Sequence, residues 1–358
     1  MNGSSRSSPV GDRWVFAAAV GLALISGIAM ASASATRDPT LAVRHTTWIV
    51  IGILTSLGVA RTNYRLWIDT AVIAYGVSLI VLALVPVAGV VRLGAARWLS
   101  IFGMSVQPSE LAKLTTVWLL ARYLSGAARP LPMRAVVTSF AVVGPPALLI
   151  FMQPDLGSAT ILGAIWFGMV WVAGAPRRAL GAAIGGLLAL LPVGWHLLEG
   201  YQRDRLVAFL HPQADPLGAG YTIIQSAIAI GSGGLWGRGW FAGTQNQLSF
   251  LPERHSDFIF SVIGEEWGFV GCLSVIVLFG LLLARTVRIA RTVSDPQGRL
   301  IAAGIFSWLG YQAFVNMGMV VGLVPVVGVP LPLVSYGGSS MMTVWVALGL
   351  LQSLSRAT

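Results

Sequence analysis

The chain has 358 residues, of which 56% belong to the apolar set and only 10% carry Asp, Glu, Lys or Arg. A transmembrane helix takes about 20 mostly apolar residues, and the mean hydropathy of +0.78 fits a chain that is largely immersed in lipid. This composition excludes a soluble enzyme, a soluble DNA-binding protein and a disordered chain. The net charge of +10 indicates no nucleic-acid partner here, because the basic residues lie between apolar runs, where they act as topology signals.

Ten long apolar stretches predict an all-α, polytopic membrane protein with ten transmembrane helices. The stretches cover residues 14–35, 41–60, 67–88, 108–124, 135–152, 156–173, 179–198, 258–284, 300–324 and 333–354. Together they form one integral membrane domain over residues 1–358, with a large external loop between helices 7 and 8.

The loops follow the positive-inside rule when both termini are placed in the cytoplasm, because most of the 23 Lys and Arg residues then lie on the cytoplasmic side. Residues 1–13 form the cytoplasmic N-terminus in this topology. The long loop 200–256 faces the outer side, as does the segment 325–340. The prolines and glycines of 325–340 exclude a regular helix and favour a re-entrant or cavity-lining segment.

The sequence offers little support for a metal or cofactor site. Cys272 is the only cysteine, which excludes an internal disulfide and a cysteine-based metal cage. The four histidines share no spacing typical of metal ligands. We therefore predict no zinc site, and no cofactor beyond the divalent cation considered below.

Ionisable side chains inside spans are costly and are therefore candidates for function. Lys113, the only lysine, lies about 7–8 Å into the fourth span, with Glu110 one turn earlier on the same helix face. The pair fits two hypotheses equally well. It is either a structural ion pair or part of a substrate cavity.

Carboxylates also lie at the outer ends of the sixth and eighth spans. Asp155 and Asp257 each precede a span, where a helix cap is the simplest role for an acid. Capping does not account for Glu265 and Glu266, which lie two turns deeper in the eighth span, about 12 Å along its axis. We therefore expect a polar cavity beside this span.

Arginines on the outer face supply the opposite charge. Guanidinium groups bind phosphate oxygens in a bidentate manner. Their number beside a membrane cavity fits an anionic lipid headgroup such as a diphosphate, although each of them can also be an ordinary solvated side chain. They are the arginines at positions 92, 97, 203, 205, 238 and 254.

Several long motifs in this order closely resemble the SEDS family (shape, elongation, division and sporulation). They are Tyr201-Gln-Arg-Asp-Arg205, Asp215-Pro-Leu-Gly-Ala-Gly-Tyr221, Gln225 to Gly234, Gly243-Thr-Gln-Asn-Gln-Leu248, Phe250-Leu-Pro-Glu-Arg-His-Ser-Asp-Phe-Ile-Phe260 and Leu333 to Ser340, preceded by Gly94 to Trp98 and Gln107 to Lys113. The resemblance covers essentially the whole chain. Residues 243–248 and 250–255 are closer to the elongation member of the family than to its division counterpart.

The resemblance implies an enzyme of the bacterial cytoplasmic (inner) membrane that polymerises lipid II into β-1,4 glycan strands during cell elongation. Polyprenyl diphosphate is released, and the active site faces the periplasm. The implied partners are lipid II, the polyprenyl-linked glycan, a class B penicillin-binding protein that acts as the transpeptidase, and other membrane proteins of the elongation complex.

The family's functional residues can be transferred position by position. Asp257 matches the essential acid and is our predicted catalytic base, because exchanging an α-linked diphosphate for a β-glycoside requires inversion. Two positions depart from the family pattern: Ser256, where threonine is expected, and Trp267, where leucine is usual. The predicted substrate-binding or supporting residues are Arg97, Trp98, Glu110, Lys113, Asp155, Gln202, Arg203 and Glu265.

The charge that develops on the leaving diphosphate must be neutralised, either by arginines and Lys113 or by a divalent cation, and the sequence leaves both open. Three other functions remain to be tested. The chain could transport or flip lipid II, take the division-type role, or act as a scaffold for the crosslinking enzyme. A flippase should have a cationic cavity that is accessible from the inner side.

Overall fold

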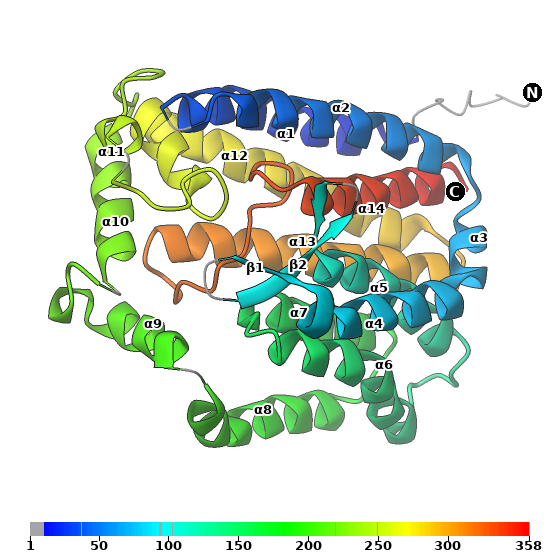
Figure 1. Cartoon of the computed structure of the whole chain (residues 1–358). Helices are drawn as coiled ribbons and strands as arrows, with labels where there is room; N and C mark the ends of the chain where they lie inside the picture. The colour runs from blue at the N-terminus through cyan, green and yellow to red at the C-terminus, as the bar shows by residue number, and fades with distance from the viewer. Residues whose placement is uncertain are drawn as a thin grey trace, which may run out of the picture.

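The computed structural model describes residues 11–36, 38–92, 95–101, 103–198, 200–218, 220–248 and 250–357. Long helices dominate it (Figure 1), and each of the ten predicted spans overlaps one of them. These helices are α1 (Arg13–Ser34), α2 (Thr40–Arg61), α4 (Ala71–Ala88), α5 (Pro108–Ser125), α6 (Met133–Phe151), α7 (Leu156–Val172), α8 (Arg177–Leu197), α12 (Ile259–Thr292), α13 (Pro296–Val320) and α14 (Gly338–Arg356). The predicted spans 67–88 and 333–354 begin before the observed helices, which start at Ala71 and Gly338. The predicted helical class is confirmed.

Seven helices in the described part of the chain are long and apolar enough to cross a membrane. They are α1, α2, α4, α6, α8, α12 and α13. The apolar helix α7 is shorter, with 17 residues, and α5 carries the buried charges Glu110 and Lys113. The count of ten spans therefore remains a prediction.

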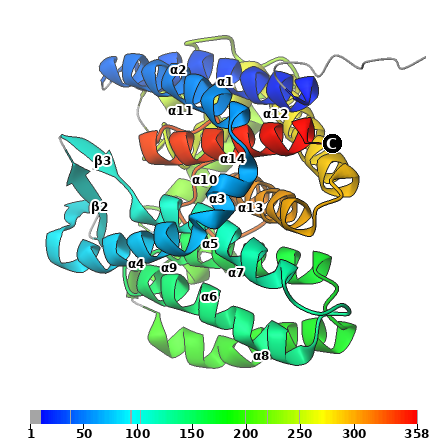
Figure 2. The same cartoon turned by 90° about the vertical axis from the view of Figure 1, so that its right-hand side faces the viewer.

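Helix α13 runs through the centre of the bundle, where it packs against α5, α7 and α12, while α14 packs on α2 and α1 on α12. Trp308 of α13 and Trp345 of α14 are fully buried. Helix α8 lies at the edge of the bundle beside α6 (Figure 2), and most of its side chains are exposed. An apolar helix with this exposure fits contact with lipid.

The chain segments that follow α2, α5, α7 and α12 lie at the same end of the bundle, which we call the basic end. The Tyr64 hydroxyl of the short helix α3 (Tyr64–Asp69) donates to Asp295 Oδ2 at 2.7 Å, and the Leu131 amide donates to the Gly174 carbonyl at 3.2 Å. Most arginines of the chain lie at this end. They include those at positions 61, 65, 122, 129, 134, 177, 178, 285, 288, 291, 299 and 356.

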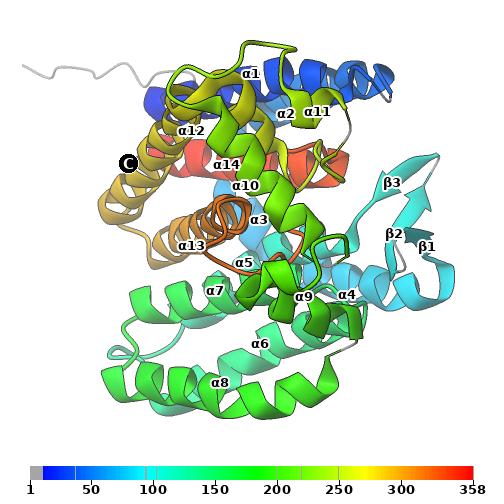
Figure 3. The ribbon, with the colours of Figure 1, turned by 90° about the vertical axis from the view of Figure 1, so that its left-hand side faces the viewer.

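The opposite end, the Asp257 end, is covered by the long loop, which is largely helical. It contains α9 (Gly200–Leu210), the 3-10 turn η1 (Pro212–Ala214), α10 (Tyr221–Gly233) and α11 (Thr244–Gln247). Figure 3 shows α9 and α10 in front of the bundle. The segment between α13 and α14 has no regular helix, as its prolines and glycines predicted.

A small antiparallel sheet between α4 and α5 was not predicted. Its strands are β1 (Val90–Arg92), β2 (Ala95–Ile101) and β3 (Met104–Val106), in the order β1-β2-β3. Figures 2 and 3 show it standing out from the bundle beside α4. The sheet forms because backbone groups outside helices still require partners. Gly103, at φ +77°, permits the tight turn before β3.

Helix α12 is broken at Gly268, where φ is +64° and ψ is −157°. The chain after α10 satisfies the backbone groups that the break releases. The Phe269 and Val270 amides donate to the Gly234 and Leu235 carbonyls at 2.8 and 3.2 Å. The break therefore fixes the loop after α10 against the middle of α12.

Candidate active site

Asp257 lies in the turn before α12, and its backbone is held by a side chain from α13. Asn316 Nδ2 donates to the Asp257 carbonyl at 2.9 Å and to the Val329 carbonyl at 2.7 Å. Gly328, at φ +68°, approaches so closely that an added Cβ would lie 3.4 Å from Asp257 Oδ2 and 3.8 Å from Arg205 Nη1. The Asp257 carboxylate therefore lies between α9 and the segment that follows α13.

Four other charged groups act on the Asp257 carboxylate. Its pKa is raised to about 7, mainly by burial and also by the negative charges of Glu253 and Asp155, while the positive charges of Arg205 and Arg97 lower it. The carboxylate makes no hydrogen bond or ion pair with any described residue. A carboxylate with a pKa near neutrality and an uncommitted lone pair can accept a proton from a substrate hydroxyl.

A cavity of about 30 Å³ lies beside these groups. Its walls include Arg97 from β2, Gln202 and Arg205 from α9, and Val326 from the segment after α13. Space of this size holds one or two water molecules, so a sugar cannot enter this arrangement.

Asp155 caps α7, as the sequence predicted, and also lies near the other polar groups of the site. Its Oδ1 accepts the Ser158 amide at 3.1 Å and so caps α7, while Gln107 Nε2 approaches Oδ2 at 3.4 Å. Arg97 binds the same hairpin: its Nε donates to the Gln153 carbonyl at 3.1 Å and its Nη2 donates to the Pro154 carbonyl. The structure brings Arg97, Asp155, Gln202 and Asp257 together.

Lys113 and Glu110 form a buried ion pair with an Nζ–Oε1 distance of 2.8 Å and side chains that are 1% exposed. Lys113 Nζ also donates to Gln312 Oε1 at 3.1 Å and lies 5.2 Å from the Trp308 ring centroid. Neither charge lines the cavity beside Asp257. The contacts fit the hypothesis of a structural pair.

The ion pair is nevertheless connected to the site by hydrogen bonds through Gln312. The Nε2 of Gln312 donates to the Pro330 carbonyl at 2.8 Å, one residue beyond the Val329 carbonyl that Asn316 binds. Two amides on one face of α13 thus hold the backbone next to Gly328. Sequence reasoning missed Gln312, Asn316 and Gly328, although two amides one turn apart in an apolar span were a usable signal.

Glu265 and Glu266 belong to a separate buried cluster beneath α11. Glu265 accepts the Gln245 amide at 2.9 Å and the Asn246 amide at 3.2 Å. Glu266 accepts the Ser32 hydroxyl at 2.5 Å and Asn246 Nδ2 at 2.9 Å. These carboxylates anchor α11 to α12 and α1. They therefore position the backbone between α11 and Asp257, and neither of them contacts the Asp257 carboxylate.

Two predicted residues lie elsewhere. Arg203 donates to the Trp195 and His196 carbonyls at 3.0 and 2.9 Å, and so closes the end of α8. Trp98 pairs with Val90 in the β1–β2 hairpin, and no described contact joins its side chain to the polar groups of the site. Arg205, two residues after Arg203, is the α9 arginine that lines the cavity.

Within the described ranges, no group of three or more His, Cys, Asp or Glu side chains is arranged to hold a metal ion. A cation held jointly by a diphosphate and one or two carboxylates needs fewer protein ligands.

The chain matches the family of FtsW, RodA and SpoVE cell cycle proteins over residues 13–358. It is 41% identical over 307 residues to peptidoglycan glycosyltransferase MrdB of Escherichia coli (strain K12), covering 86% of this chain and 83% of MrdB. A chain solved in work on structural coordination of polymerization and crosslinking by a peptidoglycan synthase complex has a TM-score of 0.81 and 37% identity, covering 96% and 97% of the two chains. Rod shape determining protein RodA of Thermus thermophilus has a TM-score of 0.71 and 31% identity, covering 96% and 95%.

The helices, the buried charges and these likenesses define a multi-pass membrane protein. The chain belongs to the FtsW/RodA/SpoVE family. This confirms the membership of the SEDS family that the motifs predicted.

Proposed function

We propose that this protein is an inverting peptidoglycan glycosyltransferase that polymerises lipid II into β-1,4 glycan strands for cell elongation and rod shape. The observation that carries the proposal is the position of Asp257, whose carboxylate lies next to Gly328 and Arg205 at the end of a membrane bundle. Its relative MrdB is named a peptidoglycan glycosyltransferase, and the chain spans most of that protein's length.

The chemistry follows from the bond that is exchanged. The acceptor hydroxyl oxygen attacks the anomeric carbon of the donor, the bond from that carbon to the diphosphate oxygen breaks, and polyprenyl diphosphate leaves with its electron pair. Asp257 takes the hydroxyl proton, since its pKa of about 7 suits a base at neutral pH. Inversion follows because the acceptor attacks from the side opposite to the leaving group.

Arg97 and Arg205 would neutralise the diphosphate, because both guanidinium groups lie close enough to lower the pKa of Asp257. A divalent cation is the other source of positive charge. Lys113 contributes through structure: its contacts with Gln312 support the backbone at Pro330, and Glu110 and Glu265 act in the same indirect way. The cavity of about 30 Å³ is too small for a sugar, so binding of the large substrate would require α9 to move away from the segment after α13. We propose that Trp98 and Arg203 contact the substrate in that arrangement.

We place the protein in the bacterial cytoplasmic membrane with both termini in the cytoplasm and the 200–256 loop and the 325–340 segment in the periplasm. The basic end would then follow the positive-inside rule. Single cysteines can test this in a Cys272→Ser background, at Leu217, which is 89% exposed, and at exposed Ser294. An impermeant maleimide should label Leu217→Cys, but not Ser294→Cys, in intact spheroplasts, and the reverse pattern would contradict this orientation.

The proposed partners are a class B penicillin-binding protein, which crosslinks the strands, and other membrane proteins of the elongation complex. The motif at 243–248 favours the elongation role over the division-type role. Restoration of rod shape in cells that lack their elongation polymerase would support this choice, whereas rescue of division alone would contradict it.

Transport of lipid II is the second candidate function, because a cavity at the basic end is lined by Arg122 and Arg134. One experiment separates the two. The purified protein, with its transpeptidase partner, is given lipid II in proteoliposomes, and both glycan product and lipid II exchange between leaflets are measured. Polymer without exchange supports the polymerase. Exchange without polymer would overturn it.

A further inference from the structure

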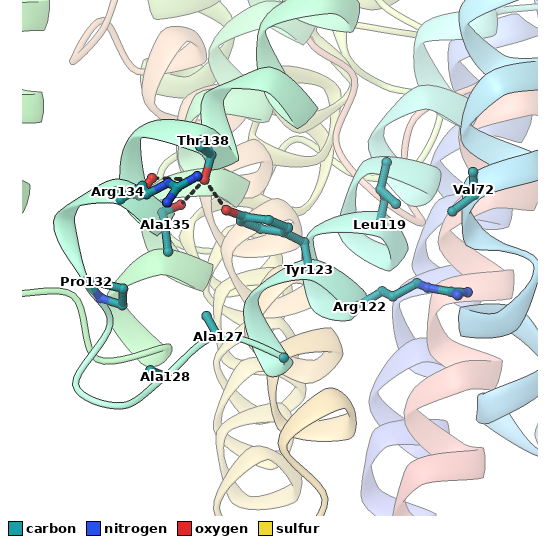
Figure 4. Close-up of a pocket in the computed structure, with 11 residues that line it drawn as sticks. Val72, Leu119, Arg122, Tyr123, Ala127, Ala128, Pro132, Arg134, Ala135 and Thr138 are labelled. Carbon is teal, nitrogen blue, oxygen red and sulfur yellow. Dashed lines mark hydrogen bonds between the residues drawn. The ribbon is translucent and has the colours of Figure 1, made fainter.

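A cavity of about 730 Å³ lies at the basic end, at the far end of the bundle from Asp257. It is bounded by α4, α5, the α5–α6 loop and α6, and its walls include Val72, Leu119, Tyr123, Pro132 and Thr138. Figure 4 shows the Tyr123 side chain reaching from α5 to Thr138 on α6, where the two hydroxyls hydrogen-bond. The volume falls within the range of roughly 300–1,000 Å³ that is typical of small-molecule sites.

The only charged residues in the cavity wall, as far as it is described, are two arginines. In the view of Figure 4, Tyr123 lies between Arg134 and Arg122. Arg122 Nη1 donates to the Ile68 and Asp69 carbonyls at 3.2 and 3.1 Å, which fixes its guanidinium and leaves its other N–H groups for a ligand. The Arg134 guanidinium makes no hydrogen bond or ion pair with a described residue. The wall is thus complementary to an anion.

Apart from the hydroxyls of Tyr123 and Thr138, which bond to each other, the side chains in the rest of the wall are apolar. The same helix, α6, also exposes an apolar face that lipid can contact. Beyond Arg134, the face of α6 exposes Met133, Val137 and Phe140, which are 46%, 59% and 47% exposed. An occupant therefore needs an anionic group for the arginines and a hydrocarbon part for the helix face. A free phosphate ion meets only the first requirement, whereas an anionic phospholipid meets both.

We propose that this cavity binds the headgroup of an anionic phospholipid from the leaflet at the basic end, with Arg134 as its main phosphate ligand. Arg122, on the other side of Tyr123 in Figure 4, adds positive charge to the wall. The acyl chains lie along the apolar face of α6. Because a lipid there contacts α4, α5 and α6 at once, it holds the ends of these helices together at a site separate from Asp257.

The test uses the full-length protein in detergent with equal amounts of phosphatidylglycerol and phosphatidylcholine of matched acyl chains, and native mass spectrometry counts the retained lipid. The parent should retain phosphatidylglycerol about tenfold better, the equivalent of one good charge-assisted hydrogen bond. Arg134→Gln should remove this preference while leaving the melting temperature in lipid-free detergent unchanged, because the side chain is exposed.

The matched control is Arg178→Gln, which removes the same charge at the same end from an exposed position outside the cavity wall. It should retain the preference. Ala128→Trp, which fills the cavity without changing its charge, should reduce retention of the lipid about tenfold as well.

Three results would overturn the proposal. The first is a preference that survives Arg134→Gln, and the second is an equal loss in Arg178→Gln, which would indicate general surface charge. The third is displacement of phosphatidylglycerol by excess inorganic phosphate or by lipid II, which would assign the cavity to a free anion or to a transported substrate.

Discussion

Lys113 and Asp257 are both ionisable groups in apolar surroundings, yet their contacts differ. Lys113 is fully buried and has three partners: Glu110 at 2.8 Å, Gln312 at 3.1 Å and the ring of Trp308 at 5.2 Å. The Asp257 carboxylate has no hydrogen bond to a described residue, although two acids and two arginines act on it. The fold thus supplies partners for the Lys113 ammonium, whereas the Asp257 carboxylate is available to a substrate.

This difference in contacts separates a charge that stabilises the fold from a charge that can take part in a reaction. A buried charge whose partners are complete stabilises one arrangement of helices, and removing one partner exposes the full cost of burying the other. A carboxylate whose pKa is raised to near 7 by burial and by neighbouring acids can exchange a proton without breaking the fold. An ionisable side chain in an apolar bundle can therefore have a structural or a catalytic role, and its hydrogen-bond partners distinguish the two.

The largest predicted effect on stability comes from the Lys113 side of this comparison. Lys113→Met leaves the Glu110 carboxylate buried and unpaired, which should reduce the free energy of unfolding by about 3–5 kcal/mol. The double variant Glu110→Gln/Lys113→Met removes both charges and should recover most of the stability. Thermal unfolding in detergent measures both.

Equal melting temperatures for the parent and the single variants Lys113→Met and Glu110→Gln would contradict the buried pair. Recovery of stability without recovery of polymerisation in the double variant would give Lys113 a second role at the substrate.

An intermediate effect is expected at Gly328. Gly328→Ala places a methyl group 3.4 Å from Asp257 Oδ2. It fills space beside the carboxylate that the acceptor hydroxyl needs, and it should therefore reduce kcat about tenfold. The matched control is Gly322→Ala, because Gly322 also has a positive φ, +76°, but nothing lies within 4 Å of its added Cβ. Both substitutions carry a similar backbone cost of about 1–2 kcal/mol, so equal rates in the two variants would contradict a role for the space beside Asp257.

The smallest effect is a displacement of the pH profile. The active form of Asp257 is deprotonated, so the polymerisation rate should rise with pH through its pKa of about 7. Glu253 raises this pKa, so Glu253→Gln should lower it and move the rising limb to lower pH. Arg205→Gln removes a charge that lowers the pKa and should move the limb to higher pH. Identical profiles in all three proteins would exclude Asp257 as the titrating group.

Much of the fold could be predicted from the sequence, because apolar runs of about 20 residues identify membrane helices without knowledge of their neighbours. The predicted range 108–124 and the observed helix Pro108–Ser125 differ by one residue at one end. The sheet around Trp98 was missed, since three short strands give little periodic signal. Its pairing, such as Leu99 with Val106, depends on a register that only the folded loop defines.

The site was predictable to the extent that charge within a span is rare. Lys113 was singled out in this way, whereas Asp155 and Asp257 precede spans and were chosen through their match to the family motifs. The choice between Arg203 and Arg205 could not be made from the sequence, because it depends on which face of α9 meets the bundle. The contact of Asn316 with the Asp257 carbonyl joins residues 59 positions apart. Such a contact cannot be predicted from the residues close to either partner in the sequence.

The most direct test of the central claim is to measure the stability and the activity of Asp257→Asn together. The amide keeps the shape of the side chain but cannot accept the proton, so the polymerisation rate with lipid II should fall by about 10²–10⁴, the usual contribution of a general base. The melting temperature should equal that of the parent, in contrast to Lys113→Met. Normal glycan yield from a folded Asp257→Asn protein would contradict the assignment of Asp257 as the base.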